Sequence, residues 1–179
     1  CLLRNKKMMS ADRRLRIMFM YYFGKTYSEL MENRIKVITG DITDKNLEDT
    51  LNGPDFDTVI NCAAVVKHFS NDDVLDRVNF HGVENLVEIC CKHNKKLVQV
   101  STVSIAGKSI ANSVPMDFLM HENQHSFGQS LDSKYGRTKW QAEKAVLEAV
   151  QNRGLRGKVI RVGNLMSRAS DGEFQANFR

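Results

Sequence analysis

The stretch K-L-V-Q-V-S, residues 96–101, is a short and mainly apolar run that leads directly into the hydroxyl-rich T-V-S. Four further runs rich in Val, Ile or Leu lie at residues 1–4, 35–39, 57–63 and 158–162. Such near-continuous apolar content is typical of parallel strands that are covered on both faces of a sheet. We therefore predict that these five runs are parallel β-strands.

Longer segments with apolar residues at three-to-four spacing separate these runs, and they predict helices. They lie at residues 10–22, 44–51, 72–92 and 133–152. Strands that alternate with helices in this way imply right-handed crossovers, so we predict a doubly wound parallel-sheet α/β fold of the Rossmann-like kind. The irregular segment 105–132 follows a strand, at the edge of the sheet where such folds bind ligands.

The bulk composition is that of one globular domain. The chain has 179 residues, of which 42% are hydrophobic and 26% charged, and its net charge is +5. Its Lys and Arg residues are scattered, which argues against nucleic-acid binding, and no apolar run reaches the roughly 20 residues that span a membrane. The four cysteines show no metal-ligand spacing, so we expect reduced thiols in a cytoplasmic protein.

The segment S-K-Y-G-R-T-K-W contains Tyr135 four positions before Lys139, on one face of a predicted helix. A nearby ammonium lowers the pKa of a tyrosine, and the pair would then suit an acid catalyst. The alternative is a packed tyrosine beside a solvated lysine. Tyr21 and Lys25 have the same spacing, but Gly24 interrupts them, and we interpret that pair as structural.

Polar residues at two strand ends favour a catalytic role for the first pair. The strand that ends in V-S-T-V-S places the hydroxyls of Ser101, Thr102 and Ser104 at the carboxyl edge of the sheet. Gly163 and Asn164 follow the last predicted strand, where they could approach a ligand closely.

A series of sequence blocks, in order along the chain, carries a family resemblance. The blocks are C-L-L-R (1–4), G-D-I-T (40–43), I-N-C-A-A-V-V-K-H-F (60–69), V-N-F-H-G-V-E-N-L (78–86), V-S-T-V-S-I-A-G (100–107), Y-G-R-T-K-W-Q-A-E-K (135–144) and R-V-G-N-L-M-S-R (161–168). With them the chain resembles the extended short-chain dehydrogenase/reductase superfamily. More specifically, it resembles the thioester reductase domains that terminate nonribosomal peptide synthetases and carboxylic acid reductases.

The resemblance implies a catalytic set of Thr102, Tyr135 and Lys139. Thr102 would hydrogen-bond the substrate carbonyl oxygen, and Tyr135 would protonate that oxygen as hydride arrives. Lys139 would hold the nicotinamide ribose and lower the pKa of the tyrosine.

The same resemblance implies a cofactor site. Arg4 matches the basic residue that receives a 2′-phosphate, which favours NADP over NAD, and Arg14 would assist it. Asp41 and Ile42 match adenine contacts. Six more positions match the cofactor cleft, the last two near the nicotinamide: Ala63, Ala64, Lys67, Asn79, Gly163 and Asn164. The alternative for each of these outer contacts is ordinary turn or packing use.

The implied function is NADPH-dependent reductive release of a carrier-bound acyl or peptidyl thioester as an aldehyde or alcohol. The implied partner is an acyl or peptidyl carrier protein that bears the thioester on phosphopantetheine. One alternative is another extended-family enzyme, such as a sugar-nucleotide epimerase or dehydratase or a fatty acyl-CoA reductase. A non-catalytic dinucleotide-binding module is a further alternative, but it would need no acid catalyst such as Tyr135.

The chain departs from the family pattern in three places. It contains no G-x-G-x-x-G loop, it has Val162 where many relatives have proline, and it stops at G-E-F-Q-A-N-F-R. We therefore expect residues 1–179 to be a partial NADP-binding reductase domain, truncated at both ends. We further expect the isolated chain to bind NADPH poorly and to turn over no thioester.

The stretch H-E-N-Q-H, residues 121–125, fits the zinc-protease pattern. That chemistry requires both histidines on one face of a regular helix, and this segment lies in an irregular loop after Pro115. We therefore expect no metal site. Glu122 matches an acidic residue of the corresponding loop in reductases, and His68 could reach the substrate cleft.

Overall fold

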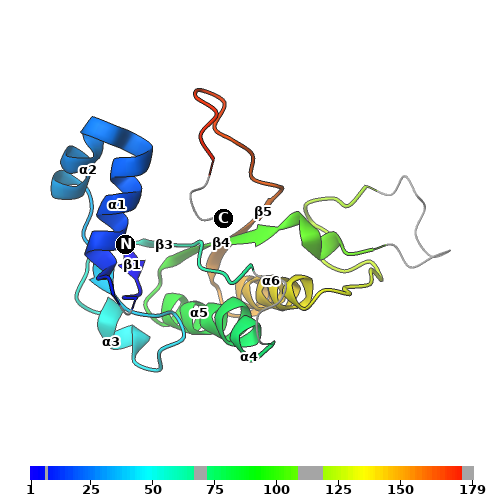
Figure 1. The fold of residues 1–179 in the computed structure, drawn as a ribbon. Helices are drawn as coiled ribbons and strands as arrows, with labels where there is room; N and C mark the ends of the chain where they lie inside the picture. Colours follow the sequence, from blue (N-terminus) through cyan, green and yellow to red (C-terminus); the bar gives the residue numbers. More distant parts are fainter. Residues whose placement is uncertain (7, 67–71, 109–118, 175–179) are drawn as a thin grey trace. The chain divides into compact units, whose positions relative to one another are not determined.

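The computed structural model describes residues 1–6, 8–66, 72–108 and 119–174. Within it the chain divides into two compact units, Cys1–Phe56 and Asp57–Arg179 (Figure 1). The single domain that we expect over residues 1–179 stays a prediction, and the two units are described separately.

The first unit holds a small parallel sheet with helices between its strands. Strand β1 pairs with β2 so that Leu2 lies opposite Ile38. The elements of this unit are β1 (Leu2–Leu3), α1 (Ala11–Phe23), η1 (Gly24–Thr26), α2 (Tyr27–Asn33), β2 (Ile38–Thr39) and α3 (Leu47–Leu51). Helix α2 was not predicted from the sequence.

Local chemistry fixes both ends of α1. The Ser10 side chain accepts a hydrogen bond from the backbone N–H of Arg13, which satisfies a donor that the first helical turn leaves open. The helix ends at Gly24, whose φ of 54° is accessible to glycine at little cost. This stop separates Tyr21 from Lys25, which lies in η1.

The second unit is built on a three-stranded parallel sheet with the order β3-β4-β5. Its elements are β3 (Thr58–Asn61), α4 (Asp72–Leu75), η2 (Asp76–His81), α5 (Gly82–Lys92), β4 (Lys96–Thr102), η3 (Val103–Ala106), α6 (Lys134–Asn152) and β5 (Arg156–Val162). Every strand pair in the described residues is parallel, so the prediction of a parallel-sheet, Rossmann-like fold is confirmed.

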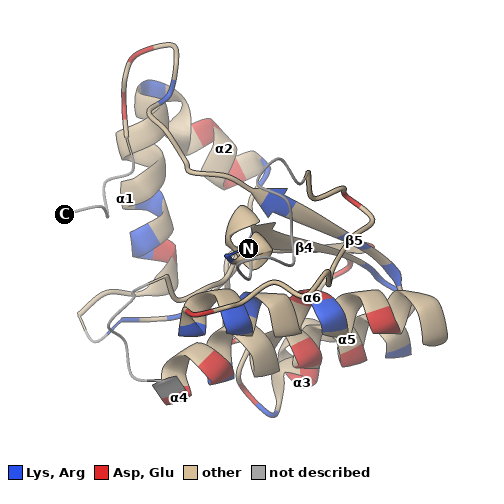
Figure 2. Cartoon of the chain, turned by 90° about the vertical axis from the view of Figure 1, so that its right-hand side faces the viewer, with Lys and Arg blue, Asp and Glu red and all other residues tan. Residues whose placement is uncertain are grey.

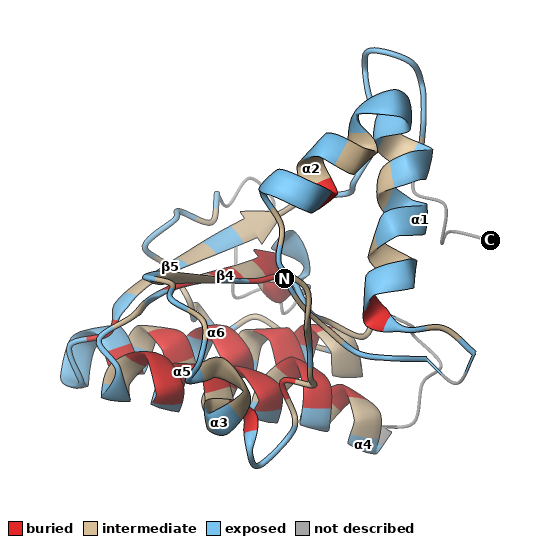
Figure 3. Cartoon of the chain, turned by 90° about the vertical axis from the view of Figure 1, so that its left-hand side faces the viewer, coloured by how far each residue is buried: buried red, intermediate tan, exposed pale blue. Residues whose placement is uncertain are grey.

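Helices α5 and α6 pack on this sheet and bury the main core of the second unit, as the red bands in Figure 3 show. Val83, Leu86, Leu97 and Val146 are all buried there. The spacing of the buried residues on α5 and on α6 follows the helical repeat, which is why the predicted helix faces are correct. None of the helices in the described residues is long and apolar enough to cross a membrane.

The segment predicted as one helix, 72–92, contains a π-helical turn. Helix α4 runs into the π-helical element η2 and then into α5. A π-turn accommodates one extra residue and often lies at a functional site. Periodicity in the sequence detects the helix, but it does not detect this change of phase.

Candidate functional site

The end of β4 and the start of α6 bring Thr102 and Tyr135 together. Thr102 is the last residue of β4 and caps η3, because its side chain accepts a hydrogen bond of 3.1 Å from the Ser104 N–H. Helix α6 begins beyond Ser133, whose side chain accepts from the Gly136 N–H. The side chains of Thr102 and Tyr135 then form a hydrogen bond.

The pKa of the Tyr135 phenol is raised, not lowered as the sequence led us to expect. Burial raises it, and the hydrogen bond with Thr102 opposes this effect only in part. The phenol therefore keeps its proton at neutral pH, as an acid catalyst must.

Lys139 lies one turn after Tyr135 and is buried. Its ammonium donates a hydrogen bond of 2.7 Å to the carbonyl oxygen of Val100 on β4. Burial lowers the pKa of Lys139, and the opposing effects of Glu143 and Cys62 offset this lowering only in part. The structure thus places Lys139 beside the strand that ends in Thr102.

Asn79, in the π-helical turn η2, is fully buried and holds the segment after β3. Its Oδ1 accepts from the Val65 N–H at 2.7 Å, and its Nδ2 donates to the Val65 carbonyl at 3.0 Å. A further hydrogen bond of 3.3 Å runs to the Thr138 hydroxyl on α6. These contacts are all with protein groups, so a contact of Asn79 with a cofactor stays a prediction.

Other predicted cleft residues lie at the ends of the strands beside Thr102. The register pairs Thr102 with Val162, so the exposed Gly163 and Asn164 follow at the same edge of the sheet. Two more follow β3: Ala63, which is exposed, and Ala64, which is half-buried. The predicted Lys67, like His68, lies outside the described residues.

The first unit brings Arg4 and Asp41 together at the ends of its two strands. Arg4 Nη1 donates to Asp41 Oδ2 at 3.4 Å, and the Arg14 guanidinium donates to the Arg4 carbonyl. Burial raises the pKa of Asp41, but hydrogen bonds from the backbone and side chain of Thr43, together with Arg4, outweigh it and lower the pKa. Ile42, the other predicted adenine contact, is buried.

A cavity of about 740 Å³ adjoins this arginine pair. Its wall contains Arg4, Asn5, Lys6, Met8, Met9 and Arg14. Figure 2 shows the basic residues of α1 gathered in the first half of that helix. Three cations around one cavity fit an anionic ligand such as a phosphate. We did not predict a role for Lys6 from the sequence, although the basic run R-N-K-K after the strand could have indicated one.

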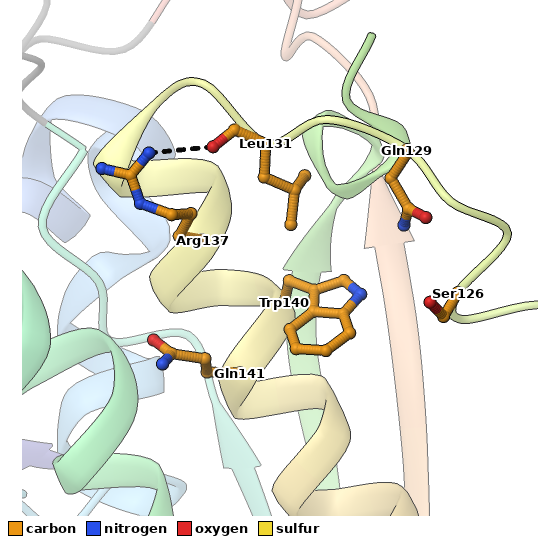
Figure 4. Close-up of a pocket in the computed structure, with 6 residues that line it drawn as sticks. All are labelled: Ser126, Gln129, Leu131, Arg137, Trp140 and Gln141. Carbon is orange, nitrogen blue, oxygen red and sulfur yellow. Dashed lines mark hydrogen bonds between the residues drawn. The ribbon is translucent and has the colours of Figure 1, made fainter. Parts of the chain in front are cut away.

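A second cavity, of about 350 Å³, lies between α6 and the preceding loop (Figure 4). Its wall contains Ser126, Gln129, Leu131, Arg137, Trp140 and Gln141. Arg137 closes one side by donating to the Leu131 and Asp132 carbonyls. The sequence did not predict this cavity, because its wall depends on how the loop folds back.

Close backbone contacts bring this loop back onto the protein. Lys108 and Ser130 form an antiparallel bridge. At Gly107, with φ of 62°, an added Cβ would lie 2.3 Å from the Ser130 carbonyl oxygen. Glycine is therefore required here for steric and conformational reasons.

The side chains of the H-E-N-Q-H stretch and of Trp140 form hydrogen bonds with backbone groups. The His121 N–H donates to Gln124 Oε1, and the His125 ring stacks on Trp140 with centroids 4.6 Å apart. His125 Nε2 lies 3.1 Å from the Trp140 carbonyl oxygen, while Trp140 Nε1 donates to the His125 carbonyl. The helix that a zinc-protease motif requires does not form in residues 119–132. Over the described ranges, no group of three potential ligands could hold a metal.

Parallel strands, a helix that carries Tyr135 and Lys139, and a hydroxyl at the strand end define a Rossmann-like member of the extended short-chain dehydrogenase/reductase superfamily. The sequence model of an NAD-binding family described as male sterility protein matches residues 1–178, and the chain belongs to this family. No curated protein matched the chain.

Solved structures agree with this assignment. The chain is 41% identical to a thiolation-reductase di-domain from an archaeal non-ribosomal peptide synthetase, with a TM-score of 0.88 over 99% of this chain. It is 30% identical to a reductase domain of the aureusimine biosynthetic cluster, with a TM-score of 0.77 over 99% of this chain. The chain spans only 38% and 45% of the length of these two proteins.

A more distant structure supports the fold alone. The UDP-glucuronic acid 4-epimerase from Bacillus cereus, solved with NAD, is 23% identical, with a TM-score of 0.61. This similarity covers 80% of the present chain and 44% of the epimerase.

Proposed function

We propose that this chain is part of an oxidoreductase that uses NADPH to release a carrier-bound acyl or peptidyl thioester as an aldehyde or alcohol. The observation that carries the proposal is the cluster at the end of β4, where Thr102 hydrogen-bonds Tyr135 and Lys139 lies one turn further along α6. The 41% identity to a thiolation-reductase di-domain supports the choice of substrate.

Each residue of the cluster has a defined task in this reaction. Thr102 and Tyr135 hydrogen-bond the thioester carbonyl oxygen and polarise the carbonyl group. Tyr135 transfers its phenolic proton to that oxygen, because the phenol is still protonated at neutral pH. Lys139 holds the nicotinamide ribose and stabilises the phenolate that proton transfer leaves behind. NADPH, when bound, supplies the hydride.

The products follow from the balance of this step. Addition of a hydride and a proton converts the thioester into a hemithioacetal. Loss of the carrier thiol then gives an aldehyde, and a second equivalent reduction gives an alcohol. The carrier domain that delivers the thioester is the proposed partner, and an acyl or peptidyl group on phosphopantetheine is the proposed substrate class.

The choice of NADPH over NADH rests on the first unit. Arg4, Lys6 and Arg14 surround one cavity, and their charges suit the extra 2′-phosphate of NADPH. Asp41 hydrogen-bonds Arg4 and holds its guanidinium at the cavity wall. We place the reductase in the cytoplasm, where thiols such as the exposed Cys62 stay reduced.

The test compares substrates for the protein that carries this chain. NADPH consumption and aldehyde or alcohol formation are measured with an acyl group on a carrier domain, an acyl-CoA, and a UDP-sugar. We expect turnover with the carrier thioester, and we expect the Tyr135→Phe variant to bind NADPH but to form no product. Turnover of only the UDP-sugar would contradict the proposal and assign the chain to the epimerase branch.

A further inference from the structure

A buried ion pair joins α6 to β5 one turn beyond Lys139. Glu143 on α6 is completely buried, and the side chain of Arg161 on β5 is 18% exposed. Arg161 Nη2 and Nε lie 3.0 and 3.1 Å from Glu143 Oε2, and Nε lies 3.4 Å from Oε1. The guanidinium therefore engages the carboxylate through two of its nitrogens.

The same guanidinium also binds the H-E-N-Q-H loop. Arg161 Nη2 donates to the Gln124 carbonyl at 2.8 Å, and Nη1 donates to the Glu122 carbonyl at 3.5 Å. A planar guanidinium can serve several acceptors at fixed angles, which the ammonium of a lysine cannot do. One side chain thus ties β5, α6 and the loop together.

Glu143 also affects the pKa of Lys139, which lies one turn earlier on α6. Two groups raise the pKa of Lys139 against the effect of its burial: the Glu143 carboxylate on α6 and the Cys62 thiol that follows β3. Tyr135 lies one turn before Lys139 on the same helix, and Val100 presents a carbonyl oxygen from β4. The Glu143 carboxylate is therefore paired directly with Arg161, and it lies one turn after Lys139 on the same helix.

We propose that Glu143 and Arg161 are positioning residues, which fix the charged ammonium of Lys139 at β4 and hold residues 122–124 beside the catalytic helix. This inference rests on the role that the proposed function gives to Lys139. A buried ion pair contributes little to stability compared with apolar packing. An arginine that makes three contacts with one buried carboxylate and two with loop carbonyls therefore points to a role in specifying geometry.

The first test measures the charge of Lys139 directly. Titration of its side chain is followed by NMR in the full chain and in the Glu143→Gln variant. We expect the midpoint to fall in this variant, because the carboxylate that favours the ammonium is gone. Glu148→Gln is the matched control, since it removes a carboxylate from the exposed Lys144–Glu148 pair of the same helix. An unchanged midpoint in Glu143→Gln would overturn the proposed effect on Lys139.

The second test measures the loop. Arg161→Lys keeps the charge but loses the fixed fork, so amide hydrogen exchange in residues 121–126 should accelerate about tenfold or more. Trp140→Phe removes the donor to the His125 carbonyl. It should loosen the same loop without shifting the Lys139 titration. Unchanged exchange in Arg161→Lys would show that Arg161 does not hold the loop.

A double variant separates positioning from folding. Arg161→Met alone leaves a buried carboxylate without its partner, which destabilises the fold. Glu143→Gln combined with Arg161→Met removes both charges, so it should fold better than Arg161→Met while still showing the lowered Lys139 midpoint. If either single variant fails to fold, the midpoint and loop exchange in this double variant decide the question.

The NMR and exchange results are independent of turnover. A wild-type reductase that is inactive on every thioester, but whose Lys139 titration shifts as expected, would refute the proposed function and leave the positioning role intact. In an active reductase, Glu143→Gln should move the pH profile of kcat, whereas Glu148→Gln should not.

Discussion

The two units of the chain differ in how far their key polar side chains are buried. In Cys1–Phe56 the side chain of Arg4 is 60% exposed, and the two strands have two residues each. In Asp57–Arg179 the key polar residues Asn79, Lys139 and Glu143 are buried beside seven-residue strands. The exposed arrangement suits the binding of a hydrated anion. The buried arrangement suits a reaction in which a proton is transferred to one particular atom.

The difference shows what burial contributes to each site. An exposed cation attracts a phosphate with little dependence on exact geometry, and salt screens the attraction. Burial lowers the pKa of a lysine unless nearby groups favour its charged form, and at Lys139 burial outweighs Glu143, which opposes it only in part. Substitutions in the second unit should therefore have the larger effects.

The largest effect is expected for Tyr135→Phe. Loss of the phenolic proton should reduce kcat by about 10²- to 10⁴-fold, the range for a general acid. Cofactor affinity should hardly change, because the ring still packs. Single-turnover kinetics with a carrier thioester measure the loss, and near-normal turnover would exclude Tyr135 as the acid.

Asn79→Ala should come next. The change leaves both backbone groups of Val65 and the Thr138 hydroxyl without their amide partner, so we expect a loss of about 2–4 kcal/mol in unfolding free energy. Urea denaturation measures it. Asn152→Ala, at an exposed position, is the control and should change stability by less than about 0.5 kcal/mol. A loss as small as the control's would show that the buried amide matters little.

In the first unit, Arg4→Ala should remove the preference for a 2′-phosphate. Loss of one charge-assisted contact should weaken binding of 2′,5′-ADP about 10- to 100-fold and leave 5′-AMP nearly unaffected. Calorimetry at low salt compares the two nucleotides. Arg13→Ala provides a matched control on α1, because Arg13 is exposed and not part of the cavity wall. Equal weakening by both variants would indicate only a general effect of charge.

The smallest effect is expected for Thr43→Val, which removes a side-chain hydrogen bond to Asp41. Because the pKa of Asp41 is lowered, its ionised carboxylate stabilises the folded state at pH values above 3.8, the ordinary pKa of an aspartate. This stability is lost as the pH falls through the lowered pKa of the folded state. The variant should therefore lose about 0.5–1 kcal/mol at neutral pH and much less in acid. Urea titrations at several pH values measure this, with Thr39→Val on β2 as the control. A pH-independent loss would mean that Asp41 is not the cause.

The sequence predicted the strands and helices whose apolar pattern reflects simple burial. The strand predicted at 96–101 is β4, and the helix at 133–152 is α6, with Tyr135 and Lys139 on one face. Helix α2 was missed because the preceding Gly24 ends α1, and the chain re-enters a helix within a few residues. Local periodicity carries no signal for such a restart.

The site was predicted only where residue type and position along a strand or helix determined it. Thr102 could be placed near Tyr135 because the segment after a parallel strand leaves from the carboxyl edge of the sheet, and the next helix begins on that side. The direction of the Tyr135 pKa was wrong, because burial depends on the packing around the ring. The Glu143–Arg161 pair was missed because its partners are 18 residues apart and belong to different elements.

The π-helical turn at Asp76–His81 makes the position of Asn79 depend on the number of residues in this segment. Deleting one residue there would let the segment close into an ordinary α-helix, which would keep its hydrogen bonds. The residues on either side would keep their faces, because the π-turn accommodates the extra residue, but Asn79 within the turn would lose its position opposite Val65. Such a deletion would leave helix content almost unchanged in a circular dichroism spectrum, yet it would release the segment that follows β3. The number of residues in this helical segment is therefore a constraint on the position of Asn79.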